Sequence, residues 1–192
     1  MSKVVQITAS IITLLLVTSL LCSQSLVINE IMSDNETVLR DYQEDYPDWI
    51  ELYNASATAI DLNKFYLSDD KDDFLRWQLP NVILEPSAYI LIFASGKNQK
   101  LQNEYHTNFK ISSAGEKLYL SNQQGVVDQF NPFSLDDDVS AGRIKDNETQ
   151  KLSVPTPGSE NILYNNELSF SKESGCYQNA FELQIDASEL DT

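Results

Sequence analysis

Apolar and polar residues alternate over short stretches of the chain, and turn-forming residues separate these stretches. In residues 48–54, Ile50 and Leu52 would lie on one face of an extended strand, with Trp49 and Glu51 on the other. This alternation predicts a half-buried strand. No window of the sequence shows convincing helical periodicity.

Other short runs rich in β-branched and aromatic residues predict further strands, at 64–68, 76–79, 89–94, 117–121 and 126–130. The run at 89–94 is apolar on both faces, which predicts a central strand. Between the last two runs, Gly125 can adopt the positive φ that closes a hairpin. Short strands at near-regular spacing predict an all-β sandwich or barrel with Greek-key connections.

Two prolines, Pro155 and Pro157, interrupt residues 154–161, and neither has an amide hydrogen to donate to a strand ladder. A domain boundary is therefore expected here, which gives one β domain over 26–161. Residues 168–177 and 180–185 favour strands again, but so short a segment cannot bury a core of its own. Residues 162–192 are therefore interpreted as a linker and the truncated start of a second β domain.

The first 25 residues have the features of a secretory signal peptide. Lys3 and the amino terminus precede an apolar run at 11–21, and Ser23 and Ser25 suit the subsites of a signal peptidase. Cleavage after Ser25 would place the mature protein outside the cell, secreted or at the cell surface, with no membrane insertion.

Two alternatives to cleavage stay open. Lipidation of Cys22 would anchor the chain, although Leu21 stands where a lipoprotein signal has a small residue. A retained transmembrane helix usually needs about 20 apolar residues, and the run from Val4 reaches that length only by including polar residues. Removal of the leader also removes Cys22, so that Cys176 is left without a partner for an internal disulfide.

The chain is strongly acidic, with 29 acidic and 13 basic residues and a formal net charge of -16. Lysine and arginine are needed to displace counterions from phosphate backbones. Nucleic acid is therefore not expected to be a partner. The expected partner is an unidentified protein or glycan.

His106 is the only histidine, which excludes catalytic or metal sites that need two histidines. The sequence also has no Gly-x-Ser-x-Gly motif to present a nucleophilic serine. We interpret His106 as a structural hydrogen-bonding residue and Ser95-Gly96-Lys97 as the turn after a strand. No catalytic or cofactor-binding residue is predicted, and the protein is not expected to be an enzyme.

Two acidic clusters, at 69–73 and 136–138, offer hard oxygen ligands of the kind that calcium prefers. Neither has the spacing of a known calcium loop, and Lys71 would lie among the ligands of the first. A solvated acidic loop is therefore the favoured interpretation, and calcium binding is the alternative. The candidate calcium ligands are Asp69, Asp70, Asp72 and Asp73, and no other cofactor is expected.

Several aromatic residues occupy strand positions from which they could form a platform for stacking sugars. Aromatic side chains at alternating positions in a sandwich more often pack in the core or at its rim, and that interpretation is favoured here. The residues concerned are Trp49, Tyr53, Tyr66, Trp77 and Phe93.

A series of short motifs covers residues 26–161 in a fixed order. They are Leu26-Val-Ile-Asn-Glu-Ile-Met32, Asp48-Trp-Ile-Glu-Leu-Tyr-Asn54, Ile60-Asp-Leu62, Tyr66-Leu-Ser-Asp-Asp70, Trp77-Gln-Leu-Pro80, Phe93-Ala-Ser-Gly-Lys97, His106-Thr-Asn-Phe-Lys-Ile-Ser112, Gly115-Glu-Lys-Leu-Tyr-Leu120, Ser140-Ala-Gly-Arg143 and Pro155-Thr-Pro-Gly158. In this order they resemble the lamin tail domain in its bacterial exported form. The resemblance implies an immunoglobulin-like β-sandwich and a non-catalytic interaction module.

Residues 170–177 resemble the start of the small β domain at the C-terminus of chitobiases. In bacterial proteins of this kind, that domain often precedes a kinase-like domain related to spore-coat protein H. The leading hypothesis is therefore an extracellular interaction or scaffolding module. The alternatives are the N-terminal part of a larger surface enzyme, or a calcium- or glycan-dependent binding module.

Overall fold

The computed structural model describes residues 26–144, 148–164, 168–170 and 185–187. The predicted signal peptide, with Cys22, and the single mature cysteine, Cys176, lie outside the described residues. No helix in the described ranges is long and apolar enough to cross a membrane.

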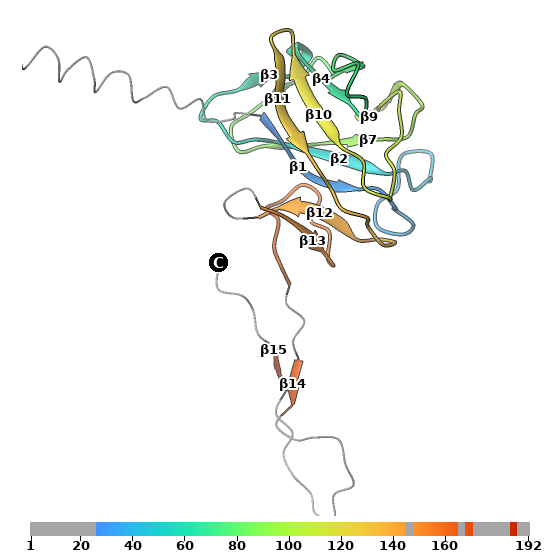
Figure 1. Ribbon diagram of the computed structural model, residues 1–192, viewed down its shortest axis with the longest axis vertical. Helices are drawn as coiled ribbons and strands as arrows, with labels where there is room; N and C mark the ends of the chain where they lie inside the picture. Colours follow the sequence, from blue (N-terminus) through green and yellow to red (C-terminus); the bar gives the residue numbers. More distant parts are fainter. Residues whose placement is uncertain (1–25, 145–147, 165–167, 171–184, 188–192) are drawn as a thin grey trace, which may run out of the picture.

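The described chain is almost entirely β-structure and forms two main sheets (Figure 1). The larger sheet has seven strands in the order β13-β12-β1-β2-β7-β9-β8, and the smaller has four in the order β11-β10-β4-β5. In the larger sheet the strands are β1 (Leu26–Met32), β2 (Trp49–Asn54), β7 (Tyr89–Phe93), β8 (Gln99–Leu101), β9 (Glu104–His106), β12 (Ser140–Arg143) and β13 (Thr149–Leu152). In the smaller sheet they are β4 (Phe65–Ser68), β5 (Trp77–Gln78), β10 (Leu118–Asn122) and β11 (Gly125–Phe130).

Short elements complete the described chain. A small ladder joins β3 (Ile60–Asp61) to β6 (Ile83–Leu84), and a single 3-10 turn, η1 (Leu62–Lys64), follows β3. Farther on, β14 (Leu168–Phe170) pairs with β15 (Ile185–Ala187). These two strands fall where a second β domain was predicted, and that domain stays a prediction.

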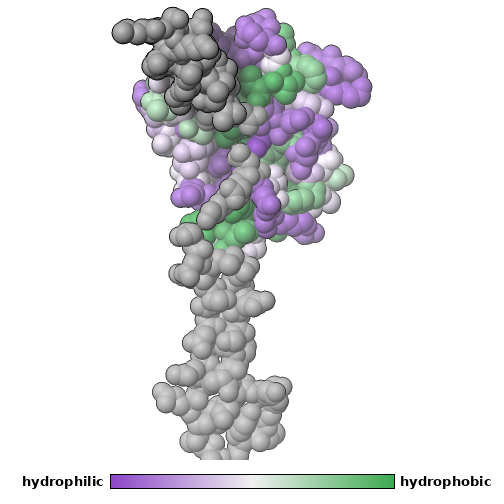
Figure 2. All heavy atoms as spheres, turned by 60° about the vertical axis from the view of Figure 1, so that its left-hand side comes forward, coloured by the Kyte–Doolittle hydropathy of each residue, from purple (hydrophilic) through white to green (hydrophobic). Residues whose placement is uncertain are grey.

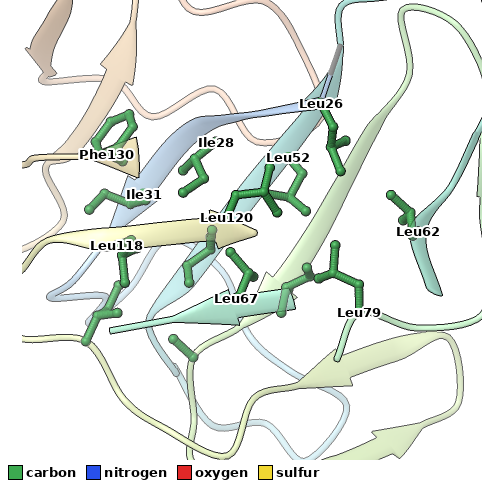
Figure 3. Packing of buried hydrophobic residues seen from close by; sticks show 14 of the residues in the cluster. Leu26, Ile28, Ile31, Leu52, Leu62, Leu67, Leu79, Leu118, Leu120 and Phe130 are labelled. Atoms are coloured by element: carbon green, nitrogen blue, oxygen red, sulfur yellow. The ribbon is translucent and has the colours of Figure 1, made fainter. Parts of the chain in front are cut away.

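The hydrophobic core lies between the two sheets (Figure 3). Ile28 and Leu52 approach it from the larger sheet, and Leu67, Leu118 and Leu120 from the smaller one. All five side chains are fully buried. The strands of both sheets therefore present alternate apolar residues to one shared interior, as a sandwich requires.

The prediction that residues 48–54 form a half-buried strand is wrong in its burial. The strand forms as β2, but Trp49 and Glu51, on the face away from the sandwich core, are as fully buried as Ile50 and Leu52. Two irregular segments lie over that outer face. Residues 33–48 contribute Leu39 to a second small core with buried Met32, Trp49 and Phe93, and residues 153–161 cover the neighbouring part of the sheet.

The hairpin and central-strand predictions are confirmed. Gly125 has a φ of +135° where β10 turns into β11, and β7 lies between β2 and β9. The sequence pattern missed the β8-β9 hairpin, because its residues are mostly polar and show no apolar alternation. Gln102, with a φ of +54°, closes its turn without the glycine that would have marked it.

Candidate functional site

Two glutamates lie side by side on the outer face of the larger sheet. Glu30 of β1 and Glu51 of β2 are cross-strand partners, and both are completely inaccessible to solvent. Like charges opposite one another in a sheet are destabilising, and buried charges are costly unless hydrogen bonds satisfy them. The hydrogen-bond donors to these two carboxylates therefore determine whether the pair can be buried at this position.

The donors to Glu30 come from the end of the domain. Thr156 donates its amide N–H to Oε1 at 3.1 Å and its hydroxyl to Oε2 at 3.0 Å. Ser140 of β12 donates its hydroxyl to Oε1 at 2.5 Å. Burial raises the pKa of Glu30 above its ordinary value, although these hydrogen bonds oppose the shift.

Glu51 is held in a similar way by fewer groups. The Gly158 amide donates to Oε2 at 2.5 Å, and the Asn29 side chain donates to Oε1 at 2.8 Å. Burial raises the pKa of Glu51 to about 7, and the nearby charge of Glu30 adds to the shift. Burial thus favours the protonated form of this carboxyl more than solvent would.

Residues 153–161, which we name the latch, are fixed at their far end by Asn161. The Asn161 side chain donates to the backbone carbonyls of Asn29 at 3.1 Å and Arg143 at 2.8 Å. It also accepts a hydrogen bond from the Thr156 hydroxyl at 2.9 Å. The latch therefore bonds to β1, β2 and β12 at once.

Gly142 of β12 leaves the room that Asn161 needs. A Cβ atom at this position would lie 2.7 Å from Asn161 Nδ2 and 2.5 Å from a methyl carbon of Leu152. Both distances are too short for real side chains. Strand β12 (Ser140–Arg143) consequently has space for Asn161 of the latch only because residue 142 has no side chain.

A buried ion pair joins the two sheets beside the latch. Arg143 of β12 contacts both carboxylate oxygens of Asp128 of β11 at 2.8 Å, and its Nε donates to the Ile28 carbonyl at 2.6 Å. Asp128 in turn accepts the Ile28 amide at 2.8 Å. The pairing register of β1 with β2 shifts between Ile28 and Glu30. The ion pair therefore satisfies backbone groups at a β-bulge.

His106 lies beneath the loop at 33–48 and is fully buried. Its Nδ1 is 3.0 Å from Ser95 Oγ, its Nε2 is 3.7 Å from Glu104 Oε2, and its ring stacks on Phe93. Burial, with the positive charge of nearby Lys97, lowers the pKa of His106. The ring is therefore a neutral, enclosed group, in keeping with its structural interpretation.

The segment Ser95-Gly96-Lys97 is a turn after β7, as predicted, with Gly96 at a φ of +73°. Lys97 Nζ donates to Asp41 at 2.5 Å and to Asp45 at 2.9 Å, so it anchors the 33–48 loop. Burial would raise the pKa of Asp41, but Lys97 and two backbone amides hold it below its ordinary value.

The four predicted calcium ligands bond to different partners. Asp69 pairs with Arg76, and Asp72 pairs with Lys71 at 2.8 Å. Asp70 accepts the Asp72 amide at 2.8 Å, and Asp73 accepts the Leu75 amide at 3.3 Å. The calcium site at Asp69, Asp70, Asp72 and Asp73 stays a prediction.

A second set of carboxylates meets elsewhere. Within the described ranges, Asp34, Glu36 and Asp137 form a group of three whose oxygens lie within 4.8 Å of one another. Asp137 belongs to the second acidic cluster of the sequence. Its neighbour Asp138 accepts the backbone amides of Glu36 and Thr37 at 2.8 and 2.9 Å, which draws the two loops together.

The aromatic residues divide between interior and surface. Trp49 and Phe93 are buried, as the packing interpretation predicted. Tyr53 stacks on Tyr89 with ring centroids 4.7 Å apart, and both rings are partly exposed. Trp77 is partly buried against the rim of the core.

Sequence reasoning did not identify the two buried glutamates or the latch as one unit. One signal was available, because Glu30 and Glu51 interrupt strands that are otherwise mostly apolar. A carboxylate in such a strand implies dedicated donors. The sequence alone does not show that the donors from Thr156 and Gly158 lie more than a hundred residues away.

The two packed sheets, the mostly antiparallel strands and the polar ties between them define an immunoglobulin-like β-sandwich domain. The Lamin Tail Domain family matches residues 23–133, and the chain belongs to that family. No curated protein matches this sequence. Strands β12 and β13 and the latch lie beyond the matched residues, yet β12 pairs with β1, β13 pairs with β12, and the latch bonds to β1 and β2.

Proposed function

We propose that this protein is a non-catalytic interaction or scaffolding module that acts outside the cell or at its surface. One observation carries the proposal. Three groups capable of acid–base chemistry, Glu30, Glu51 and His106, are inaccessible to solvent and are bonded to other parts of the same domain. Their hydrogen bonds join the strands to the latch, which leaves the surface of the domain for recognition.

The latch supports a scaffolding role. Its contacts with Glu30, Glu51 and Asn29 fix the path of the chain up to Asn161. Whatever follows residue 161 therefore starts from a defined point on the sandwich. A module that positions a partner or an attached domain needs such a rigid exit.

The character of the surface also supports a role in recognition. Figure 2 shows one face on which hydrophilic side chains predominate and hydrophobic ones occur in small groups. The overall charge of -16 favours solubility and disfavours phosphate-rich partners.

The non-catalytic role is tested by assaying the purified protein for hydrolase and kinase turnover, alongside the Glu51→Gln variant. We expect no turnover from either. Turnover by the unaltered protein that is lost in the variant would refute the proposal, because Glu51 would then act as an acid or base.

The extracellular location depends on the predicted signal peptide. Fusing residues 1–25 to a reporter enzyme that is active only after export should give activity outside the cytoplasm. Replacing the apolar run at 11–21 with polar residues should abolish that activity. Export that is unaffected by this replacement would contradict the assignment.

A larger surface enzyme stays the alternative, and the β14-β15 strand pair that follows the latch favours it. The nucleotide sequence downstream of the codon for Thr192 decides between the two. An open reading frame that continues into a kinase-like domain would make this chain its N-terminal part.

A further inference from the structure

A groove opens at one side of the sandwich, where the edges of the two sheets meet. One wall is β5, the edge strand of the smaller sheet, with the residues that follow it, and the other is the β8-β9 hairpin, at the edge of the larger sheet. The groove has a volume of about 340 Å³, which is in the range of small-ligand sites.

Aromatic rings enter this groove from both sheets. Trp77 pairs with the core residue Leu67, so its side chain points to the inner face of the smaller sheet. Tyr105 precedes His106, which stacks on Phe93 on the outer face, so Tyr105 points to the inner face of the larger sheet. Both rings line the groove, and both are partly exposed.

The remaining lining is mostly polar and carries little charge, and it also includes Pro80 and the buried His106. Carboxamides from both walls, including Gln78, Asn81 and Asn98, supply donors and acceptors. Lys100 contributes an ammonium group that lies 5.4 Å from the centroid of the Tyr105 ring. None of the described residues that line the groove is acidic, although the chain as a whole carries a charge of -16.

We propose that this groove, walled by Trp77 and Tyr105, binds a carbohydrate. A sugar ring offers an apolar C–H face for stacking on an aromatic ring, and hydroxyl groups that exchange hydrogen bonds with carboxamides. Partly exposed aromatics with neutral amides around them fit that combination. The proposal rests on the proposed function, since it names a class of partner for the interaction module.

The arrangement of tryptophans supplies a direct assay. The chain has two tryptophans, of which Trp49 is fully buried and Trp77 is partly exposed in the groove. A bound sugar should therefore change the fluorescence of Trp77 alone. The probes are chitotetraose, cellotetraose, mannotetraose and tetragalacturonate, each titrated into the purified protein.

We expect a saturable change in fluorescence with at least one of these oligosaccharides. Tyr105→Ala should weaken its binding about tenfold through lost stacking, and Asn81→Ala about threefold through a lost hydrogen bond. Asn81 is exposed, so its replacement should leave the melting temperature unchanged. The Lys100→Ala variant shows whether the bound sugar is acidic or neutral. It should weaken the binding of an acidic sugar and leave the binding of a neutral sugar unchanged.

Tyr53→Ala is the matched control, because Tyr53 is a partly exposed aromatic residue on the outer face of the larger sheet. The Tyr53→Ala variant should bind the oligosaccharide with the same affinity as the unaltered protein. The proposal is overturned if no oligosaccharide in the panel binds, if the groove variants bind normally, or if Tyr53→Ala loses binding instead. Displacement of the sugar by a proline-rich peptide at lower concentration would also overturn it in favour of a peptide site.

These outcomes are distinct from failure of the proposed function. Absence of sugar binding removes the carbohydrate groove and leaves a non-catalytic module with another partner. Hydrolysis of a bound oligosaccharide would instead refute the non-catalytic role.

Discussion

Replacing Glu51 by glutamine should remove a pH dependence from the stability of the sandwich. Burial raises the pKa of Glu51 to about 7 in the folded protein, from 4.5 in an unperturbed chain. Below pH 4.5 both states hold the proton. Between the two values the folded state holds it and the unfolded state does not, so the free energy of unfolding falls as pH rises.

The size of the effect follows from these two pKa values. Each pH unit between them costs about 1.4 kcal/mol, which amounts to about 3 kcal/mol over the whole interval. Glutamine does not titrate. From about pH 4 to about pH 8 the stability of Glu51→Gln relative to the unaltered protein should therefore rise by about 3 kcal/mol. A constant offset from the altered hydrogen bonds with Asn29 and Gly158 does not affect this difference.

Urea unfolding, followed by circular dichroism at a series of pH values, measures the effect. Comparing the two proteins cancels the titration of groups that do not interact with Glu51, such as the partly buried Asp48, whose pKa burial raises to about 6. Glu85→Gln, at an exposed position, is the control and should follow the unaltered protein at every pH. Parallel pH profiles for Glu51→Gln and the unaltered protein would refute the reasoning.

Three further predictions concern the latch, the ion pair and calcium. Gly142→Ala should destabilise the domain by about 1–3 kcal/mol, because the new methyl group displaces Asn161; urea unfolding measures this, and an unchanged midpoint contradicts it. Asp128→Ala should cost about 3–5 kcal/mol in the same assay, because it removes the carboxylate that pairs with the mostly buried Arg143 and accepts the Ile28 amide, and a loss below about 1 kcal/mol would contradict it. Calcium titrated into the purified protein tests the candidate ligands Asp69, Asp70, Asp72 and Asp73: a saturable heat signal that the Asp70→Asn, Asp72→Asn double variant lacks would support the site, and its absence is the result that a solvated acidic loop predicts.

The strands that form the core were predictable, because alternate residues of each strand face the interior of the sandwich and are apolar. Residues 89–94 and the hairpin at Gly125 are clear cases, since both depend on local properties of the chain. The β8-β9 hairpin was not predictable in this way. It lies at a sheet edge, where exposed polar residues such as Gln99 and Lys100 are compatible with strand or loop.

The burial of Glu51 shows a different limit. Alternation placed it on the face away from the core, which is correct, and assigned that face to solvent, which is wrong. Periodicity reports which residues share a face. It does not report that a loop and a distant segment cover that face, because those contacts depend on tertiary structure. The burial of Glu30 and Glu51 on the outer face is therefore a property of the tertiary structure that the sequence pattern does not contain.

The position of β1 between β2 and β12 has a consequence for how the domain forms. Its bonds to β2 link residues close in the sequence, whereas its bonds to β12 join Glu30 and Ile31 to Gly142 and Ala141. Such non-local pairing is slow to form. Until β12 arrives, one edge of β1 presents unpaired amide and carbonyl groups that can pair with another chain. A chain cut at residue 133, where the family match ends, would keep that edge open permanently and should aggregate.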